Sequence, residues 1–276
     1  MSIVVAFANQ KGGVGKTTTV VNIARAAITN HRLTVLVIDA DPQGNATKVL
    51  APNHQGSLPH SLATVIGRTA HSPISTAAVA SDWTGLDVVP SGGDDLANAA
   101  QDLVTMTAGR ESRLKKAITE ISDRYDLILI DCPPSLDQLP INAFTAADAL
   151  VLVAELGQFA LDGLDRLLDT VEVIQEYTNP ELTIVAAIIN DVQKTKRMDY
   201  WMRELRDSIA HLPEPVPVLD PPVQRATFIA EAQESGQGLD MWGTVKARVL
   251  HQTYADYLTS ILQSIKNGEN RNDSEV

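Results

Sequence analysis

A glycine-rich segment with two lysines follows the first apolar run of the chain and carries the residue types that bind phosphate. Glycines let successive backbone N–H groups turn toward phosphate oxygens, and the N-terminus of a following helix adds a partial positive charge. Lys16 would neutralise the β- and γ-phosphates of a nucleotide, and the Thr17 hydroxyl would coordinate Mg²⁺. The sequence therefore predicts a P-loop that binds ATP and Mg²⁺. The residues of this loop are Lys11, Gly12, Gly13, Val14, Gly15, Lys16, Thr17 and Thr18.

Three aspartates stand at or just after the ends of predicted strands. Asp131 ends an apolar run, and a carboxylate in that position is a common partner of Mg²⁺, usually through water. Asp39 ends an earlier run, and Asp41 follows two positions later. A carboxylate near the γ-phosphate can orient a water molecule for in-line attack, which makes Asp41 a candidate catalytic residue. Taken alone, Asp41 is equally explained as the first residue of an Asp-Pro turn.

Short apolar runs alternate with helical patterns along the chain, as is typical of βαβ units. Several runs are apolar almost throughout, as expected for strands covered on both faces. The predicted strands are Ile3–Ala8, Thr34–Ile38, Leu86–Val89, Leu127–Ile130, Ala149–Val153, Thr183–Ile189 and Val216–Leu219. The predicted helices are Lys16–Thr29, Asp94–Met106, Glu111–Arg124, Leu161–Tyr177, Asp199–Ala210 and Trp242–Lys266. The expected fold is α/β: a three-layer P-loop NTPase fold with a mostly parallel central sheet flanked by helices on both faces.

One domain over residues 1–266 is predicted, followed by a polar, disordered tail over 267–276. The last helix is expected to pack on the core through one apolar face. That face would consist of Val245, Val249, Tyr257, Ile261 and Ile265. The segment Pro52–Thr84, rich in Ser, Thr, His and Pro, is the least regular; we expect a helix with loops there, and a partner-binding surface is plausible.

Composition narrows the function classes. The chain has 276 residues, a formal net charge of −12 and one cysteine, Cys132. A single thiol excludes an internal disulfide framework and metal sites built on several thiolates of one subunit, and it favours a reducing cytosol. No run approaches the roughly 20 apolar residues that span a bilayer, and the N-terminus does not resemble a signal peptide. The acidic balance argues against DNA binding as a bulk property but leaves local basic patches open.

The form of the loop identifies a family resemblance. The usual P-loop pattern has a glycine five positions before Gly15, where this chain has Gln10, and it lacks the additional Lys11. The form Lys-Gly-Gly-Val-Gly-Lys-Thr-Thr resembles the deviant Walker motif of the ParA/MinD family. Four further short segments resemble motifs of this family and follow in the same order as in the family: Asp39–Asn45, Leu127–Ser135, Phe159–Leu164 and Glu231–Ala232.

The resemblance implies roles for several residues. Asp39 corresponds to a carboxylate near the magnesium, together with Thr17 and Asp131, and Asp41 corresponds to the residue that positions the attacking water. Lys11 corresponds to a lysine that reaches the nucleotide of the other subunit, so the implied assembly is a homodimer with ATP sandwiched between its subunits. We therefore expect catalytic roles for Lys11, Lys16 and Asp41.

A base-binding site is expected near the end of the sixth strand. The amide of Asn190 offers a donor and an acceptor that could read the adenine edge, as a similarly placed Asn does in MinD-like relatives. Pro221, in Asp220-Pro221-Pro222, would form another wall. A strand-end Asn is as often a turn former, which is the alternative here.

The resemblance also suggests an output. MinD relatives end in a basic amphipathic helix that lies on membranes. This C-terminus ends in acidic residues, so no membrane partner is expected. Relatives without an N-terminal reader domain bind DNA non-specifically as ATP dimers, through basic surface residues that contact phosphates. The candidates are Lys194, Lys196, Arg197, Arg203, Arg206, Arg225, Lys246 and Arg248. A solvated basic face is the alternative, and Phe228 stands where the family often has a second Arg.

The predicted function is that of a cytoplasmic, nucleoid-associated partition ATPase. A ParB-like centromere-binding protein would stimulate slow hydrolysis and release the dimer from DNA. Two alternatives share the same site: an ATPase that positions a protein cargo, and a regulator that uses ATP only to pair subunits.

Overall fold

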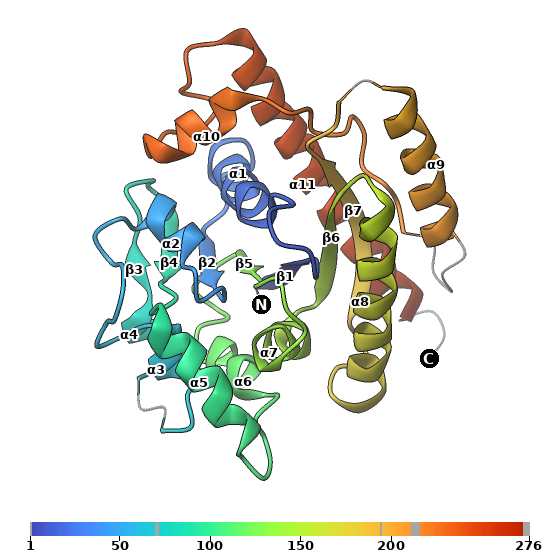
Figure 1. The fold of residues 1–276 in the computed structure, drawn as a ribbon. Coiled ribbons are helices and arrows are strands. Elements are labelled where there is room, and N and C mark those ends of the chain that lie inside the picture. Colours follow the sequence, from blue (N-terminus) through green and yellow to red (C-terminus); the bar gives the residue numbers. More distant parts are fainter. Residues whose placement is uncertain (1, 70–71, 194, 211–215, 273–276) are drawn as a thin grey trace.

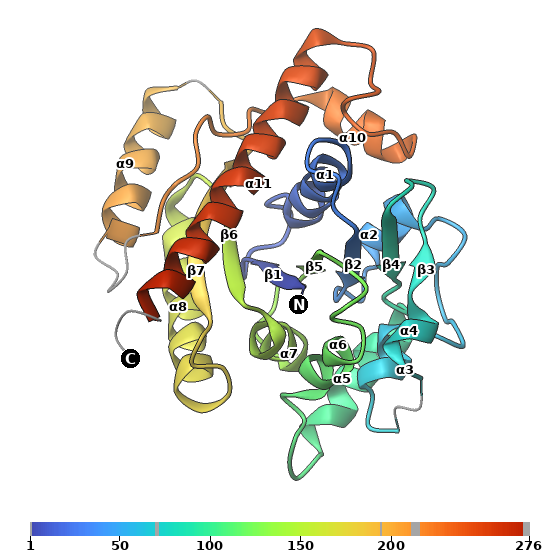
Figure 2. The same ribbon diagram turned by 180° about the vertical axis from the view of Figure 1, so that it is seen from behind.

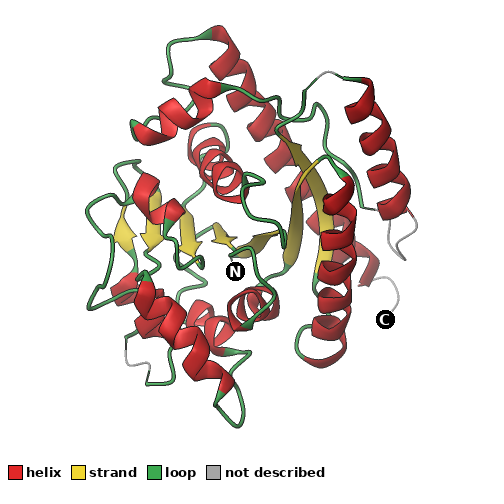
Figure 3. Ribbon diagram, in the orientation of Figure 1, coloured by secondary structure: helices red, strands yellow, loops and turns green. Residues whose placement is uncertain are grey.

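The computed structural model describes residues 2–69, 72–193, 195–210 and 216–272. Within these ranges, seven strands form one sheet in the order β3-β4-β2-β5-β1-β6-β7. All neighbours are parallel except β3 and β4, so the predicted α/β fold is confirmed. Figures 1 and 3 show the sheet as the middle layer between helices. The strands are β1 Ile3–Ala8, β2 Val35–Asp39, β3 Val79–Ala80, β4 Leu86–Val89, β5 Leu127–Asp131, β6 Ala149–Glu155 and β7 Thr183–Asn190.

The helices divide between the two faces of the sheet. Alternate strand side chains point to opposite faces, so each strand contributes to two separate apolar clusters. One cluster includes residues of α3, α5, α6, α7, α8 and α9, and the other includes residues of α1, α2, α10 and α11. Figure 2 shows α11 crossing the second face beside α1. The helices are α1 Lys16–Thr29, α2 Asn45–Leu50, α3 Leu62–Ile66, α4 Ile74–Ala77, α5 Asp94–Val104, α6 Arg113–Thr119, α7 Gln138–Ala146, α8 Gln158–Tyr177, α9 Lys196–Ala210, α10 Thr227–Glu234 and α11 Val245–Asn272.

The seventh predicted strand, Val216–Leu219, does not form. Val218 makes only an isolated bridge to Ala187, whose N–H and C=O bond to Pro217 O and Leu219 N at 2.9 Å each. Pro217 has no N–H to donate, so it interrupts the ladder that a strand would need. The segment lies beside β7 without joining the sheet as a strand.

The C-terminal helix differs from its prediction in two ways. Tyr257, Ile261 and Ile265 are buried, but Val245 and Val249 are 67% and 62% exposed. A repeat of four residues drifts by about 40° per step on a helix of 3.6 residues per turn, so the start of α11 faces elsewhere. In addition, α11 continues to Asn272, so residues 267–272 are helical rather than a disordered tail. Residues 273–276 of that predicted tail lie outside the described residues.

The irregular segment Pro52–Thr84 contains more structure than the helix with loops expected there. It holds α3, α4 and the edge strand β3, and Leu62, Ile66 and Ile74 are buried in the core. At the start of α3 the Ser61 N–H donates to Thr64 Oγ1 at 3.0 Å. Among the described residues, no helix combines the length and apolarity that crossing a membrane requires.

A buried amide joins α6 and α7 on one face of the sheet. Asn142 is fully buried, and its Oδ1 accepts from Leu114 N at 3.2 Å. Its Nδ2 donates to Arg110 O and to Gln138 O, both at 2.8 Å. Leu114 lies in the first turn of α6, where backbone N–H groups have no partner within the helix. Asn142 therefore satisfies a helix terminus from across the interface.

We predict that Asn142→Ala lowers the free energy of unfolding by about 2–4 kcal/mol, because it strips partners from buried backbone groups. Urea denaturation would measure the change. The matched control Asn98→Ala, at an exposed position on α5, should change stability by less than about 0.5 kcal/mol. A loss below about 1 kcal/mol for Asn142→Ala would contradict the assignment.

Candidate functional site

The glycine-rich loop connects β1 to α1 and forms the floor of a cleft of about 810 Å³. Gly15 precedes the first residue of α1 with φ 84°, a left-handed conformation that favours glycine. A Cβ at Gly15 would lie 2.7 Å from Asn190 Nδ2. The loop thus fits closely against the end of β7, and its backbone borders the cleft as phosphate binding requires.

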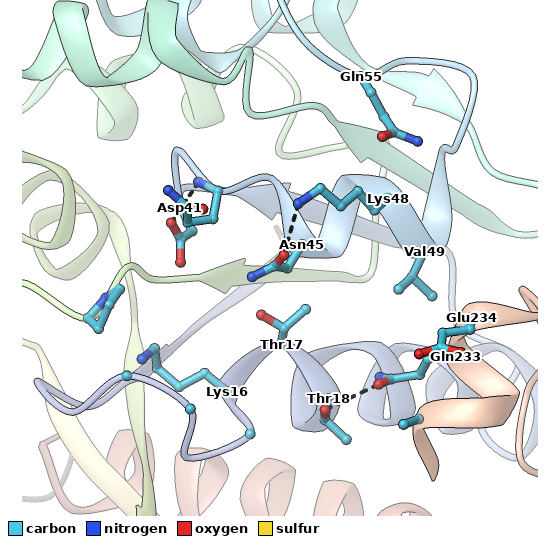
Figure 4. Close-up of a pocket in the computed structure, with 16 residues that line it drawn as sticks. Lys16, Thr17, Thr18, Asp41, Asn45, Lys48, Val49, Gln55, Gln233 and Glu234 are labelled. Atoms are coloured by element: carbon cyan, nitrogen blue, oxygen red, sulfur yellow. Dashed lines mark hydrogen bonds between the residues drawn. The ribbon is translucent and has the colours of Figure 1, made fainter. Parts of the chain in front are cut away.

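Lys16 occupies the centre of the loop. It is 7% exposed, and its Nζ donates to Asn9 O at 3.2 Å and to Lys11 O at 3.3 Å. Burial lowers the pKa of Lys16, while the charges of Asp131 and Asp41 oppose this shift. Figure 4 shows the ammonium at the edge of the cleft, where an anionic ligand can replace the two carbonyl partners.

Asp39 and Asp131 lie side by side because β2 and β5 pair in register at these residues. Both are completely buried. Burial raises the pKa of Asp131 above its ordinary range, and the Asp39 charge adds to this rise. Burial also raises the pKa of Asp39 to about 6, although hydrogen bonds from Thr47 N (2.7 Å) and Thr47 Oγ1 (2.6 Å) oppose the shift. The pair forms a buried carboxyl centre whose ionised form a nearby cation would stabilise.

The residues around this pair fit a magnesium ion. Thr17 Oγ1 donates to Asp131 Oδ2 at 2.7 Å, while Asp131 Oδ1 is buried and has no hydrogen-bond partner among the described residues. No group of three or more His, Cys, Asp or Glu residues in the described ranges could hold a metal by itself. A magnesium ion here would therefore combine Thr17 and Asp131 with phosphate oxygens and water, as this ion commonly does.

Asp41 faces the same cleft as Lys16 and Thr17 (Figure 4). Its carboxylate accepts from Gln43 N at 2.9 Å, and its carbonyl accepts from Ser91 Oγ at 2.7 Å. The Asx turn to Gln43 fixes the loop after β2, so the turn interpretation and the catalytic interpretation of Asp41 are compatible. A carboxylate oriented in this way can bind a water beside the loop.

The other predicted nucleotide contacts do not line this cleft. The Lys11 ammonium pairs with Glu155 Oε2 at 2.5 Å. Asn190 is buried behind the loop, where Nδ2 donates to Val14 O and Thr19 Oγ1 at 3.0 Å each. The carbonyl of Pro221 accepts from the Tyr257 hydroxyl. The roles of Lys11 across a dimer and of Asn190 and Pro221 at the base stay predictions.

Several residues in or beside the cleft were not predicted from the sequence. Thr47, buried behind the cleft, donates to Asp39, and Gln233 on α10 lines the cleft and accepts from Thr18 Oγ1 at 3.3 Å (Figure 4). The cleft is also lined by Gln43, Asn45, Lys48, Val49, Gln55, Pro134, Ala230 and Glu234. Gln43 and Asn45 belong to the Asp39–Asn45 motif, so the sequence could have identified them as candidate site residues. Nothing local marks Gln233, which follows Thr18 by 215 positions.

The basic candidates for DNA contact fall into two groups. Arg206 donates from Nη2 to both carboxylate oxygens of Asp220, and Arg225 donates from Nε and Nη2 to the two oxygens of Asp191. Lys196, Arg197 and Arg203 are exposed on α9, and Lys246 and Arg248 are exposed on α11. Lys194 lies outside the described residues. Arg206 and Arg225, held by aspartates, are less available to phosphates than the other exposed cations of α9 and α11.

Comparison with known sequences gives consistent matches. A family model described as an AAA domain matches residues 2–184. The chromosome partitioning protein ParA of Caulobacter vibrioides is 36% identical over 237 residues, which cover 85% of this chain and 85% of that protein. The sporulation initiation inhibitor protein Soj of Bacillus subtilis is 40% identical over 189 residues, covering 68% of this chain and 72% of Soj.

Solved structures resemble the chain over nearly its whole length. Cobyrinic acid a,c-diamide synthase from Mycobacterium smegmatis, with bound ADP and magnesium, is 32% identical, covers 97% of both chains and has a TM-score of 0.77. Apo McdA of Cyanothece has a TM-score of 0.82, covers 95% of this chain and 100% of its own, and is 22% identical, so it shows the fold alone.

Thr17 offers a test of the site as built. We predict that Thr17→Val reduces magnesium-dependent ADP affinity about tenfold or more, because it removes the hydroxyl that donates to Asp131 and that would coordinate the ion. Thr17→Ser keeps the hydroxyl and should bind nearly as the unaltered protein does. Titration with a fluorescent ADP analogue, in magnesium and in EDTA, would measure both. Equal losses in magnesium and EDTA would count against a role of Thr17 at the ion.

Proposed function

The chain belongs to the ParA/MinD family of P-loop ATPases, and from this premise we propose that it is a partition ATPase. ATP binding pairs two subunits, the pair binds DNA without sequence preference, and hydrolysis releases it. A ParB-like centromere-binding protein stimulates the hydrolysis. The place of action is the cytoplasm, on the nucleoid, with no membrane partner.

The cleft supports ATP hydrolysis through three groups of this chain. The backbone of the loop binds the phosphates, and Lys16 exchanges the carbonyls of Asn9 and Lys11 for the β- and γ-phosphate oxygens. Asp41 orients a water whose oxygen attacks the γ-phosphorus in line. As this bond forms, the bond from the γ-phosphorus to the bridging oxygen breaks and the water gives up a proton, so the products are ADP and inorganic phosphate. Bound Mg²⁺, beside Thr17 and Asp131, supplies charge neutralisation on the phosphates. Asp39 lies beside Asp131 in the buried centre and accepts a hydrogen bond from Thr47.

The observation that carries the proposal is the meeting of Lys16, Thr17 and Asp41 in one cleft. The relatives named for chromosome partitioning support the partition role, since they include a protein covered over 85% of its length. For DNA, Lys196, Arg197 and Arg203 on α9 are the strongest candidates, whereas Arg206 and Arg225 are held by aspartates. The net charge of −12 is compatible with a basic activating segment on the ParB-like partner.

We predict that retention on unrelated duplex DNA requires ATP, is absent with ADP or without nucleotide, and is lost in Lys16→Ala. Raising salt from about 50 to 200 mM should weaken it about tenfold or more, because phosphate contacts release counterions. Arg197→Ala/Arg203→Ala should weaken retention, while Lys115→Ala/Lys116→Ala, an equal charge change on α6, should not. No retention in any condition, with ATPase activity intact, would move the output to a protein cargo.

A second prediction separates the two lysines of the loop. Lys16→Ala should abolish ATP binding, whereas Lys11→Ala should lower turnover more than affinity, because Lys11 acts only once subunits pair. Equal loss of affinity in both variants would contradict the role of Lys11 across the interface.

Asp41→Ala should bind ATP with unchanged affinity but should not hydrolyse it. If the unaltered protein showed no measurable hydrolysis, that result would favour a regulator that uses ATP only for pairing. Equilibrium binding and phosphate release would measure these quantities.

A further inference from the structure

Lys11 is held to its own subunit at its N–H, its carbonyl and its ammonium. The N–H donates to Asn9 Oδ1 at 2.8 Å, and the carbonyl accepts from Lys16 Nζ at 3.3 Å. The ammonium donates to Glu155 Oε2 at 2.5 Å. Asn9 Nδ2 also donates to Val153 O at 2.7 Å, and Val153 lies on β6, the strand that ends at Glu155. The backbone and the side chain of Lys11 are thus both fastened to the end of β6.

Glu155 stands beside a second carboxylate. In the β6–β7 register Glu155 is opposite Asn190, and Asp191 follows with φ 58°, an uncommon conformation for a residue other than glycine. Arg225 donates through Nε to Asp191 Oδ1 at 2.6 Å. The hydrogen bonds from Arg225 lower the pKa of Asp191 most, against its partial burial, and the charges of Arg225 and Lys11 lower it further. Lys11, Glu155, Asp191 and Arg225 therefore form a row of two carboxylates between two cations.

We propose that Glu155 is a positioning residue that retains Lys11 in the unpaired subunit and releases it to the nucleotide of a second copy of this chain. The inference rests on the proposed function, in which Lys11 acts across the interface. It adds the step that must precede that contact, namely the breaking of the ion pair with Glu155.

The geometry indicates what resists and what assists the release. Departure of Lys11 leaves Glu155 and Asp191 adjacent with Arg225 as their one compensating cation in the row, and neighbouring like charges are unfavourable. Phosphates in the loop draw Lys16 Nζ away from Lys11 O, which removes one of the three tethers. An unpaired subunit without nucleotide thus keeps Lys11, and a nucleotide-loaded one holds it less firmly.

Glu155→Gln tests the step, because the amide keeps the size of the side chain and removes its charge. ATP-dependent pairing should occur at a protein concentration about three- to fivefold lower, with basal turnover raised by a similar factor, as expected for a partly exposed ion pair. In a Lys11→Ala background the same change should have no effect, since the two side chains form one interaction. Glu111→Gln, which breaks the Arg110–Glu111 pair of similar exposure, is the matched control and should leave pairing unchanged.

A second measurement reports the ion pair without requiring dimers. In nucleotide-free protein, acetylation of Lys11 by acetic anhydride, followed by mass spectrometry, should be about threefold faster in Glu155→Gln than in the unaltered protein or in Glu111→Gln. Unchanged acetylation overturns the retention of Lys11 by Glu155. Faster acetylation with unchanged ATP-dependent pairing overturns its part in release. Faster acetylation in a protein that never pairs with ATP overturns the proposed function and, with it, the release step.

Discussion

Two carboxylates buried side by side at the ends of adjacent strands set the conditions for the rest of the site. Asp39 and Asp131 cannot both ionise in an apolar interior without compensation, and burial accordingly raises the pKa of each. Thr47 and Thr17 donate to them, and the charge of Lys16 opposes the rise at Asp131. This compensation is incomplete, as the unpartnered Asp131 Oδ1 shows. The hydrogen bonds allow the two carboxyl groups to be buried in the folded protein, and a cation would stabilise them further. A site of this kind is suited to bind a metal–phosphate complex.

The parts of the fold that depend on local signals could be predicted from the sequence. Short apolar runs predicted the strands β1, β4 and β7 to within one residue. This worked because a strand that is covered on both faces has an almost uninterrupted apolar sequence. The glycine-rich loop and the aspartates at strand ends followed from the same reasoning. The strand predicted at Val216–Leu219 was wrong. The run is apolar enough to resemble a strand, but Pro217 has no N–H to donate to the hydrogen-bond ladder of a sheet. The prediction that Val245 and Val249 pack on the core was also wrong. A repeat of four residues drifts from the helical period of 3.6, and over about 12 residues it reaches another face of the helix.

The parts that depend on tertiary packing could not be predicted. Gln233 reaches Thr18 from the opposite end of the chain, and Asn190 turns its amide to the back of the loop rather than to the cleft. Neither orientation has a local sequence signal. The same holds for Arg206 and Arg225, whose availability is decided by Asp220 and Asp191. A count of basic residues gives eight candidates, whereas within the described ranges the folded protein leaves five of them exposed and outside these two ion pairs: Lys196, Arg197, Arg203, Lys246 and Arg248.

The ends of the sheet have a consequence for how this chain can associate. At one end β3 is only two residues long, and at the other the backbone around Val218 bonds on both sides of Ala187 in β7. Exposed strand edges invite pairing with strands of other chains, and short or covered edges prevent it. Growth of the sheet from subunit to subunit is thus blocked at both margins. Self-association is left to side chains and bound ligands, contacts that can form and dissolve repeatedly without the persistence of a shared backbone ladder.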